Sequence, residues 1–211
     1  MPNPATGRSM SVGVDGSKWA KARKRSGRNR SGIRGDAMTQ VEKLLAAKKW
    51  SKARALIQEE LLSDPADHWL WTTLGLTFYE QRQYDKALKC SKRAVELAPD
   101  CALVLWDYAG ALYMTGREHS ALAIWTLLQD MELEDVAYGE CSEGMDWAMQ
   151  LVNDVHYRMG RYYQWKGNKE LARVSFGKYL HNRSHGVTSI YEVRKVKEYL
   201  NQLEQEMVVA R

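Results

Sequence analysis

Apolar residues recur at intervals of three and four along the chain from residue 37 onward, which is the spacing of amphipathic helices. Short polar or glycine-containing breaks separate these segments, and the segments follow one another in pairs. The apolar series from Met145 to Tyr163 predicts one long helix. A final stripe, which runs from Ile190 to Met207, predicts one more helix over residues 188–208. The chain has only four prolines and few β-branched runs, which argues against an all-β fold.

The segment 68–101 has the most regular pattern. Gly75 is expected to let the first helix of this pair approach the second, and Ala87 is the small residue opposite it. Pro99 is expected to stop the second helix. The pattern consists of Trp71-x2-Leu74-Gly75-x2-Phe78, followed by Ala87, Ala94 and Pro99.

This pattern resembles the tetratricopeptide repeat, a pair of helices with a period of 34 residues. Ser91 departs from it, because an aromatic or large apolar residue is usual there. Shifting the register by one period places further units at residues 34–67 and 102–135, the first of them degenerate. After an acidic insert at residues 136–152, a fourth unit fits residues 153–186.

The resemblance implies an all-α fold, a right-handed solenoid of antiparallel helix pairs. About three and a half units would occupy residues 37–187, and residues 188–211 would form a capping helix that closes the exposed end of the core. Members of the family bind peptides or proteins in a concave groove and are rarely enzymes. The main functional hypothesis is therefore a non-enzymatic adaptor or scaffold that binds a protein segment.

In the family, certain positions of each first helix face the groove. Here those positions are rich in aromatic residues, which dominate binding energetics, and they end in a polar region at the fourth unit. A packing role against neighbouring helices remains the alternative for each of them. The predicted groove residues are Trp69, Thr72, Leu76, Tyr79, Leu103, Trp106, Gly110, Tyr113, Tyr157, Arg161 and Gln164.

The charge is unevenly distributed. The net charge of +5 divides into +7 for residues 1–36 and −2 for the rest, so a basic arm precedes a slightly acidic body. The arm is rich in Gly and Ser and has few large apolar residues, which predicts disorder. Its candidate contacts with an acidic partner or nucleic acid are Lys18, Lys21, Arg23, Lys24, Arg25, Arg28 and Arg30.

Three roles for this arm remain open: a solvated tail, contact with an acidic protein, or phosphate contacts with nucleic acid. The last gives the alternative function, a nucleic-acid-associated factor whose solenoid recruits a partner. Self-association through the groove or the cap is a third hypothesis. Binding to generic RNA or DNA that weakens with salt would distinguish the nucleic-acid hypothesis from the adaptor.

The sequence shows no catalytic motif of the metalloprotease, P-loop, serine hydrolase or dinucleotide-binding type, so we expect no enzyme and no cofactor. The three cysteines, Cys90, Cys101 and Cys141, include no CxxC pair and suit a reducing compartment. We interpret them as ordinary residues and predict no metal site. A cytoplasmic location is expected, with nuclear or organellar locations left open. The oligomeric state and the identity of the partner are not predicted.

Overall fold

The computed structural model describes the backbone of residues 33–209 and the side chains of residues 37–206. This part of the chain is helical and contains no strand. The helices are α2 (Ile33–Ala46), α3 (Trp50–Ser63), α4 (His68–Glu80), α5 (Tyr84–Leu97), α6 (Ala102–Met114), α7 (Glu118–Asp130), α8 (Leu133–Tyr138), α9 (Met145–Trp165), α10 (Lys169–Ser184) and α11 (Val193–Val209).

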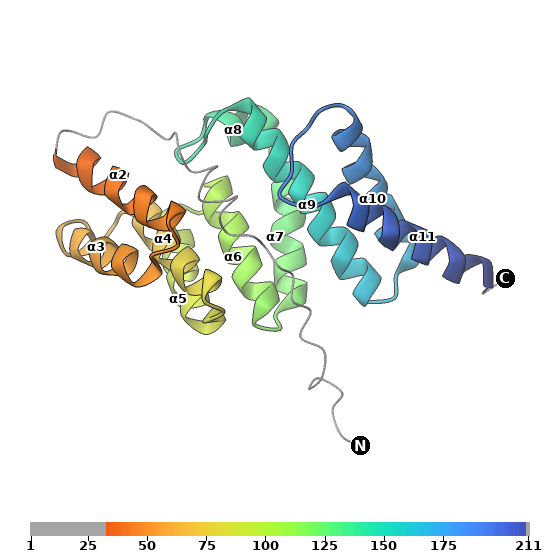
Figure 1. The fold of residues 1–211 in the computed structure, drawn as a ribbon, viewed down its shortest axis with the longest axis horizontal. Helices are drawn as coiled ribbons and strands as arrows, with labels where there is room; N and C mark the ends of the chain where they lie inside the picture. Colours follow the sequence, from red (N-terminus) through yellow and green to blue (C-terminus); the bar gives the residue numbers. More distant parts are fainter. Residues whose placement is uncertain (1–32, 210–211) are drawn as a thin grey trace, which may run out of the picture.

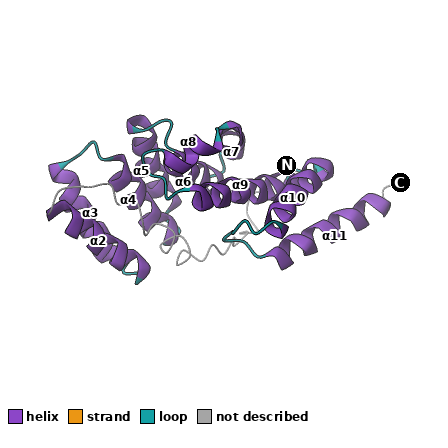
Figure 2. Cartoon of the chain, turned by 90° about the horizontal axis from the view of Figure 1, so that it is seen from above, coloured by secondary structure: helices purple, strands orange, loops and turns teal. Residues whose placement is uncertain are grey.

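The helices form antiparallel pairs that stack into a solenoid. The pairs are α2 with α3, α4 with α5, α6 with α7, and α9 with α10, and each pair packs on the next along the long axis of the molecule (Figure 1). The short helix α8 lies against α9, and α11 follows α10 at the far end (Figure 2). The all-α solenoid expected from the 34-residue period is confirmed.

Small residues set the distance between the two helices of a pair. A Cβ atom placed on Gly75 of α4 would lie 3.1 Å from the Ser91 hydroxyl of α5. A Cβ atom on Gly160 of α9 would lie 2.5 Å from the ring of Phe176 in α10. Real Cβ atoms do not come that close, so the close approach of α9 and α10 requires glycine at residue 160.

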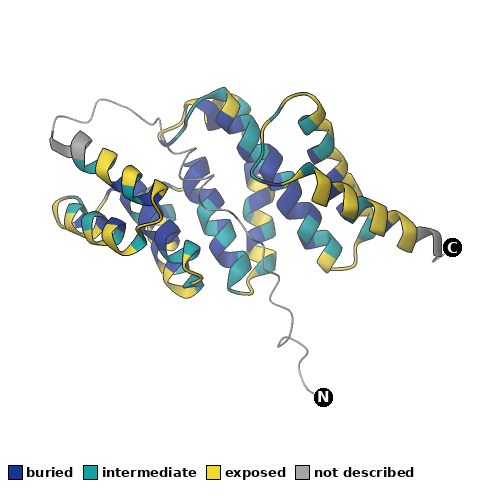
Figure 3. Cartoon of the chain, in the orientation of Figure 1, coloured by how far each residue is buried: buried dark blue, intermediate teal, exposed yellow. Residues whose placement is uncertain are grey.

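The core is continuous from α2 to α9, and a second apolar cluster joins α9 to α10 and α11. Figure 3 shows the buried residues along the inner faces of the stacked helices. Because α9 contributes Leu151 and Met159 to the first cluster and Tyr157 to the second, it connects the two. The long helix predicted for this region is therefore the element that joins the last pair to the stack.

The last helix begins at Val193, later than the predicted residue 188, because the preceding segment makes a different set of contacts. Ser189 donates a hydrogen bond of 2.5 Å to a carboxylate oxygen of Asp154 in α9, and Thr188 donates one of 2.8 Å to Gln150. The Tyr179 hydroxyl of α10 donates to the carbonyl of Tyr191 at 2.7 Å. These bonds hold residues 188–191 as a loop across α9.

At the other end, α2 begins at Ile33, inside the predicted arm of residues 1–36. Helices extend readily once anchored, and α2 is anchored by the buried Val41 and Leu45. The rest of the arm, with its candidate contacts Lys18 to Arg30, lies outside the described residues. Its disorder and its contact with nucleic acid or an acidic protein stay predictions.

The turn between the helices of each pair needs one residue with a positive φ. Lys48 and Arg82 have φ values of 55° and 58° in the first two pairs, and Gly116 and Gly167 have 78° and 76° in the next two. Non-glycine residues are strained in this region by about 1–2 kcal/mol. The first two turns therefore carry strain that glycine removes in the others.

We expect Arg82→Gly to raise the free energy of unfolding by about 0.5–1 kcal/mol, since relief of strain exceeds the extra entropy of glycine in the unfolded chain. The counterpart Gly116→Ala should lower it by about 1 kcal/mol. Urea unfolding of both variants checks this. A loss of stability in Arg82→Gly would show that its side chain contributes more than its backbone conformation costs.

Candidate functional site

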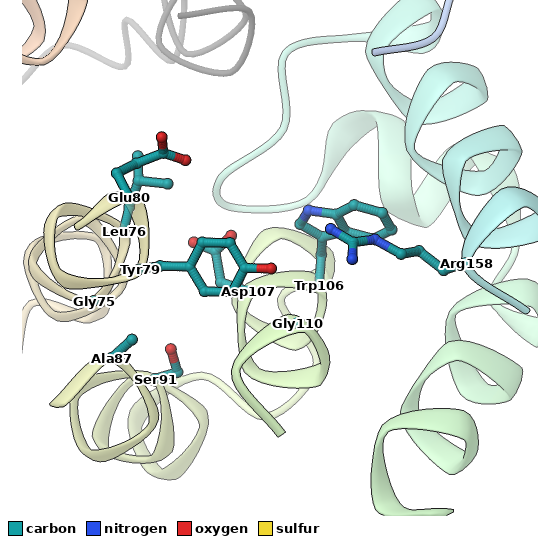
Figure 4. A pocket seen from close by; sticks show the side chains of 10 residues that line it. All are labelled: Gly75, Leu76, Tyr79, Glu80, Ala87, Ser91, Trp106, Asp107, Gly110 and Arg158. Carbon is teal, nitrogen blue, oxygen red and sulfur yellow. The ribbon is translucent and has the colours of Figure 1, made fainter. Parts of the chain in front are cut away.

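A small pocket, partly open to solvent, lies where α4, α5, α6 and α9 meet (Figure 4). Figure 4 shows Tyr79 and Trp106 as its aromatic walls, with Arg158 reaching across from α9 toward Trp106. Most of the lining comes from two consecutive first helices, α4 and α6. The lining residues are Gly75, Leu76, Tyr79, Glu80, Ala87, Ser91, Trp106, Asp107, Gly110 and Arg158.

Glycine at residue 110 keeps the floor of this pocket open. A Cβ atom there would lie 3.7 Å from the ring of Tyr79, which is ordinary van der Waals contact. Tyr79 is half-buried and also packs edge-on against Tyr84 at 5.3 Å between ring centroids. A small residue at 110 is therefore not required by packing, and a larger side chain there would fill the pocket.

The guanidinium of Arg158 is a buried cation, and one of its hydrogen-bond donors has no partner in the described part of the chain. Its side chain is 5% exposed, and its guanidinium carbon lies 5.7 Å from the Trp106 ring and 5.5 Å from the Tyr191 ring. Its Nη1 atom has no hydrogen-bond partner among the residues described, and neither has the buried hydroxyl of Tyr191. Buried polar groups are normally paired, so these two atoms mark a place where an acceptor would be stabilised.

Two carboxylates lie on the opposite side of the pocket from Arg158. Asp107 of α6 accepts a hydrogen bond of 3.0 Å from the Thr72 hydroxyl of α4, and Glu80 stands at the end of α4. Arginine is a permanent cation. The pocket thus combines aromatic walls with charges of both signs at its edges.

The structure brings some of the predicted groove residues together and separates others. Leu76, Tyr79, Trp106 and Gly110 line the pocket. Tyr113 is half-buried and packs on Trp125 of α7 at 5.4 Å between ring centroids. Those buried among other side chains, outside the pocket, are Trp69, Thr72, Leu103 and Tyr157.

At the fourth unit the chain covers its own first helix. The ring of Tyr191 stacks on Tyr157 at 3.7 Å between centroids. Arg161 lies over the ring of Tyr199 in α11 at 4.2 Å and donates a hydrogen bond of 2.9 Å to Gln164. Tyr157 and Arg161 are therefore in contact with the C-terminal part of the chain, and Gln164 is held by Arg161.

The three charged residues of the pocket, Glu80, Asp107 and Arg158, were missing from the predicted groove. A signal for Asp107 existed, since Thr72 stands one repeat and one residue earlier and consecutive first helices are neighbours. Arg158 directly precedes Met159, which belongs to the apolar series of the predicted long helix. A charged residue there indicates either a surface position or a buried site, and periodicity alone does not distinguish them.

A second cluster forms at the starts of α4 and α6, where His68, Cys101 and Cys141 bring their donor atoms within 4.8 Å of one another. The His68 Nε2 atom lies 3.1 Å from the Cys141 sulfur and 3.5 Å from a carboxylate oxygen of Glu140. Hydrogen bonds from Cys141 and then His68, opposed by burial, lower the pKa of Cys101 to about 5. The sequence analysis missed this cluster.

Comparison with known proteins agrees with the repeat pattern. The model of the tetratricopeptide repeat family matches residues 68–101. The solved structure of MamA superposes with a TM-score of 0.53 at 16% identity, covering 86% of this chain and 98% of that one. No curated protein matches significantly.

Two other solved structures are similar at lower scores. PilW, described as a widely conserved type IV pilus biogenesis factor, has a TM-score of 0.47 at 14% identity, covering 84% of this chain and 93% of that one. A putative protein binding protein from Bacteroides ovatus has a TM-score of 0.37 at 16% identity, covering 82% of this chain and 98% of that one. In the part of the chain that the structure describes, no helix is long and apolar enough to cross a membrane.

Asp154, which anchors the loop over α9, gives a prediction about pH. Burial raises the pKa of this carboxyl from 3.8 to about 7, against the opposing hydrogen bonds from Ser189 and the Ile190 amide. Between these two values the folded state binds more protons than the unfolded state, so stability should fall as the pH rises from about 4 to 7. The stability lost over this pH range is on the order of 4 kcal/mol.

Urea unfolding at several pH values should show this decline in the native chain and a flatter profile in Asp154→Asn. Other titrating groups act on both proteins, so the difference between the two profiles is the measured quantity. Parallel profiles would mean that Asp154 is ionised without cost in the folded state.

Proposed function

We propose that this chain, whose residues 68–101 match the tetratricopeptide repeat, is a non-enzymatic scaffold that binds a segment of another protein in the pocket of Tyr79, Trp106, Gly110 and Arg158. Tetratricopeptide repeats generally mediate protein–protein interaction. A fold alone does not identify a binding site, so the proposal rests on the pocket itself.

The observation that carries the proposal is the unpartnered Nη1 atom of Arg158 at the edge of an aromatic pocket. Leaving a buried donor unpaired costs about 1–3 kcal/mol of stability. An unsatisfied buried group in a native structure calls for an explanation, and we infer that the missing acceptor belongs to a ligand. The unpaired hydroxyl of Tyr191, whose ring lies 5.5 Å from the same guanidinium, is a second unsatisfied group beside Arg158, although Tyr191 itself does not line the pocket.

The ligand segment follows from the chemistry of the walls. An apolar side chain would enter above Gly110, between Tyr79 and Trp106, where Trp and Tyr give large contact area with few rotatable bonds. A carboxylate or a main-chain carbonyl would accept from Arg158, and a carboxylate gives the stronger, charge-assisted bond. Asp107 and Glu80 on the other side favour a donor or basic group there. We therefore propose a segment with an apolar anchor flanked by an acidic residue.

Panning a random peptide display library against the intact chain supplies the probe, and fluorescence anisotropy measures the affinity of the selected peptides. Gly110→Leu should fill the pocket and weaken binding by about 30-fold or more, which corresponds to about 2 kcal/mol. The matched control is Gly177→Leu in α10, where an added Cβ meets no atom within 4 Å. Peptides that bind both variants like the native chain would place the binding surface elsewhere.

Arg158→Met gives an independent measurement, because it removes the donor and keeps most of the side-chain volume. Binding of peptides with an acidic residue should fall by about tenfold or more, in the range of a charged hydrogen bond. The free energy of unfolding should change by less than about 1 kcal/mol, since removal of the unpaired Nη1 donor offsets the loss of the ring contacts and of the hydrogen bond to Tyr79. A loss of stability above about 1 kcal/mol would show that Arg158 is a structural residue instead.

A further inference from the structure

The second cluster, at the starts of α4 and α6, collects three soft metal-ligand side chains from distant parts of the chain. His68 is the first residue of α4, Cys101 precedes the first residue of α6, and Cys141 lies in the loop between α8 and α9. His68 and Cys141 are 73 residues apart in sequence. Because first helices of consecutive repeats lie side by side, the repeat brings His68 and Cys101 together, and the insert adds Cys141.

From this geometry we propose that His68, Cys101 and Cys141 bind a zinc ion, with Glu140 as the fourth ligand. Zinc in proteins is tetrahedral, with bonds of about 2.3 Å to sulfur and about 2.0–2.1 Å to nitrogen or oxygen, so its ligand atoms stand roughly 3.3–3.8 Å apart. His68 Nε2 lies 3.1 Å from the Cys141 sulfur and 3.5 Å from the Glu140 oxygen. All three of the His and Cys donor atoms lie within 4.8 Å of one another, whereas the exposed Glu140 side chain is outside this group and has to turn toward the sulfur atoms to complete the tetrahedron.

The donor set selects the class of metal. Two thiolates and an imidazole are soft or borderline ligands, which suit zinc and disfavour magnesium and calcium, the cations that prefer oxygen. Copper(I) also favours thiolates, but the imidazole and the nearby carboxylate fit a four-coordinate dication better. The Glu140 side chain is 69% exposed whereas that of His68 is 15% exposed. The site therefore has a buried interior and an open side through which an ion enters.

Cys90 shows what a purely structural cysteine looks like in this chain. It is buried in α5, and burial alone raises its pKa to about 11. Cys101 and Cys141 differ from Cys90 because their sulfur atoms lie close to each other and to the His68 imidazole. A cysteine that only fills space in the core does not require a second thiol or an imidazole beside its sulfur. None of the three cysteines forms a disulfide in this structure.

A zinc ion here would fix the loop between α8 and α9 to the repeat stack. The loop contributes Glu140 and Cys141, while α4 and α6 are the two helices that form most of the pocket wall. The ion would hold the starts of these helices at one spacing. This role is independent of the proposed peptide binding, since none of the four ligands lines the pocket.

The test uses the intact chain, reduced and stripped of metal by a chelator. One equivalent of cobalt(II) should give the near-ultraviolet charge-transfer band of cobalt bound to thiolate and the visible bands of a tetrahedral site, and zinc should abolish both. Zinc should also raise the melting temperature by about 4 °C or more. Absence of the thiolate band in the native chain would overturn the proposal, whatever the variants do.

Single variants assign the ligands. Cys101→Ser, Cys141→Ser and His68→Ala should each weaken zinc binding by at least about 100-fold in competition with a chromophoric chelator. Cys90→Ser, which also removes one thiol, should bind zinc like the native chain. Equal binding by native chain and Cys141→Ser would overturn the site, and equal binding by Glu140→Gln would overturn the fourth ligand. A variant that fails to fold is replaced by alkylation of the native chain, where zinc should protect Cys101 and Cys141.

A disulfide between Cys101 and Cys141 is the competing outcome. Mass spectrometry of protein purified without air would detect it as a linked peptide pair. If that link forms and the reduced chain still takes up no cobalt, the cluster is a redox pair and the zinc site is wrong.

Discussion

The close approach of the two helices within each pair is the constraint on which the structure depends. At the equivalent position of three first helices stand Gly75, Ala109 and Gly160, all buried. The ring of Phe176 occupies the space that a side chain at residue 160 would need. Since the core is only as thick as one helix pair, a wider spacing at one pair would open the interface with the next.

The long helix α9 transmits this packing to the end of the chain. It belongs to both apolar clusters, and its residue Asp154 accepts a hydrogen bond from Ser189 in the loop before α11. That loop brings Tyr191 onto Tyr157 and near Arg158. The same helix therefore closes the groove at the fourth unit and supplies the cation of the pocket between the second and third units. Helix α9 therefore both carries the residues that the C-terminal segment covers at the fourth unit and places the Arg158 cation in the pocket.

The pocket and the histidine–cysteine cluster sit at different levels of the same two helices. The cluster lies at the starts of α4 and α6, and the pocket lies farther along them, near Gly75 and Gly110. Stacked repeats place equivalent positions side by side, so any two chemically active residues at similar repeat positions become neighbours. Both proposed sites therefore lie on one arrangement of parallel first helices.

The sequence by itself determined the helix pairs, because the 34-residue period, Gly75, Ala87 and Pro99 act through local sterics and short-range packing. It also located Leu76, Tyr79, Trp106 and Gly110, since their repeat positions specify a helix face. Only the tertiary structure decided that Tyr191 covers Tyr157, that Arg158 reaches Trp106, and that Cys141 joins His68 and Cys101. The Tyr191 and Cys141 contacts depend on a loop and an insert outside the repeat pattern, and none of the three follows from a local periodicity. The loop is held by its hydrogen bonds to Asp154 and by the stacking of Tyr191 on Tyr157.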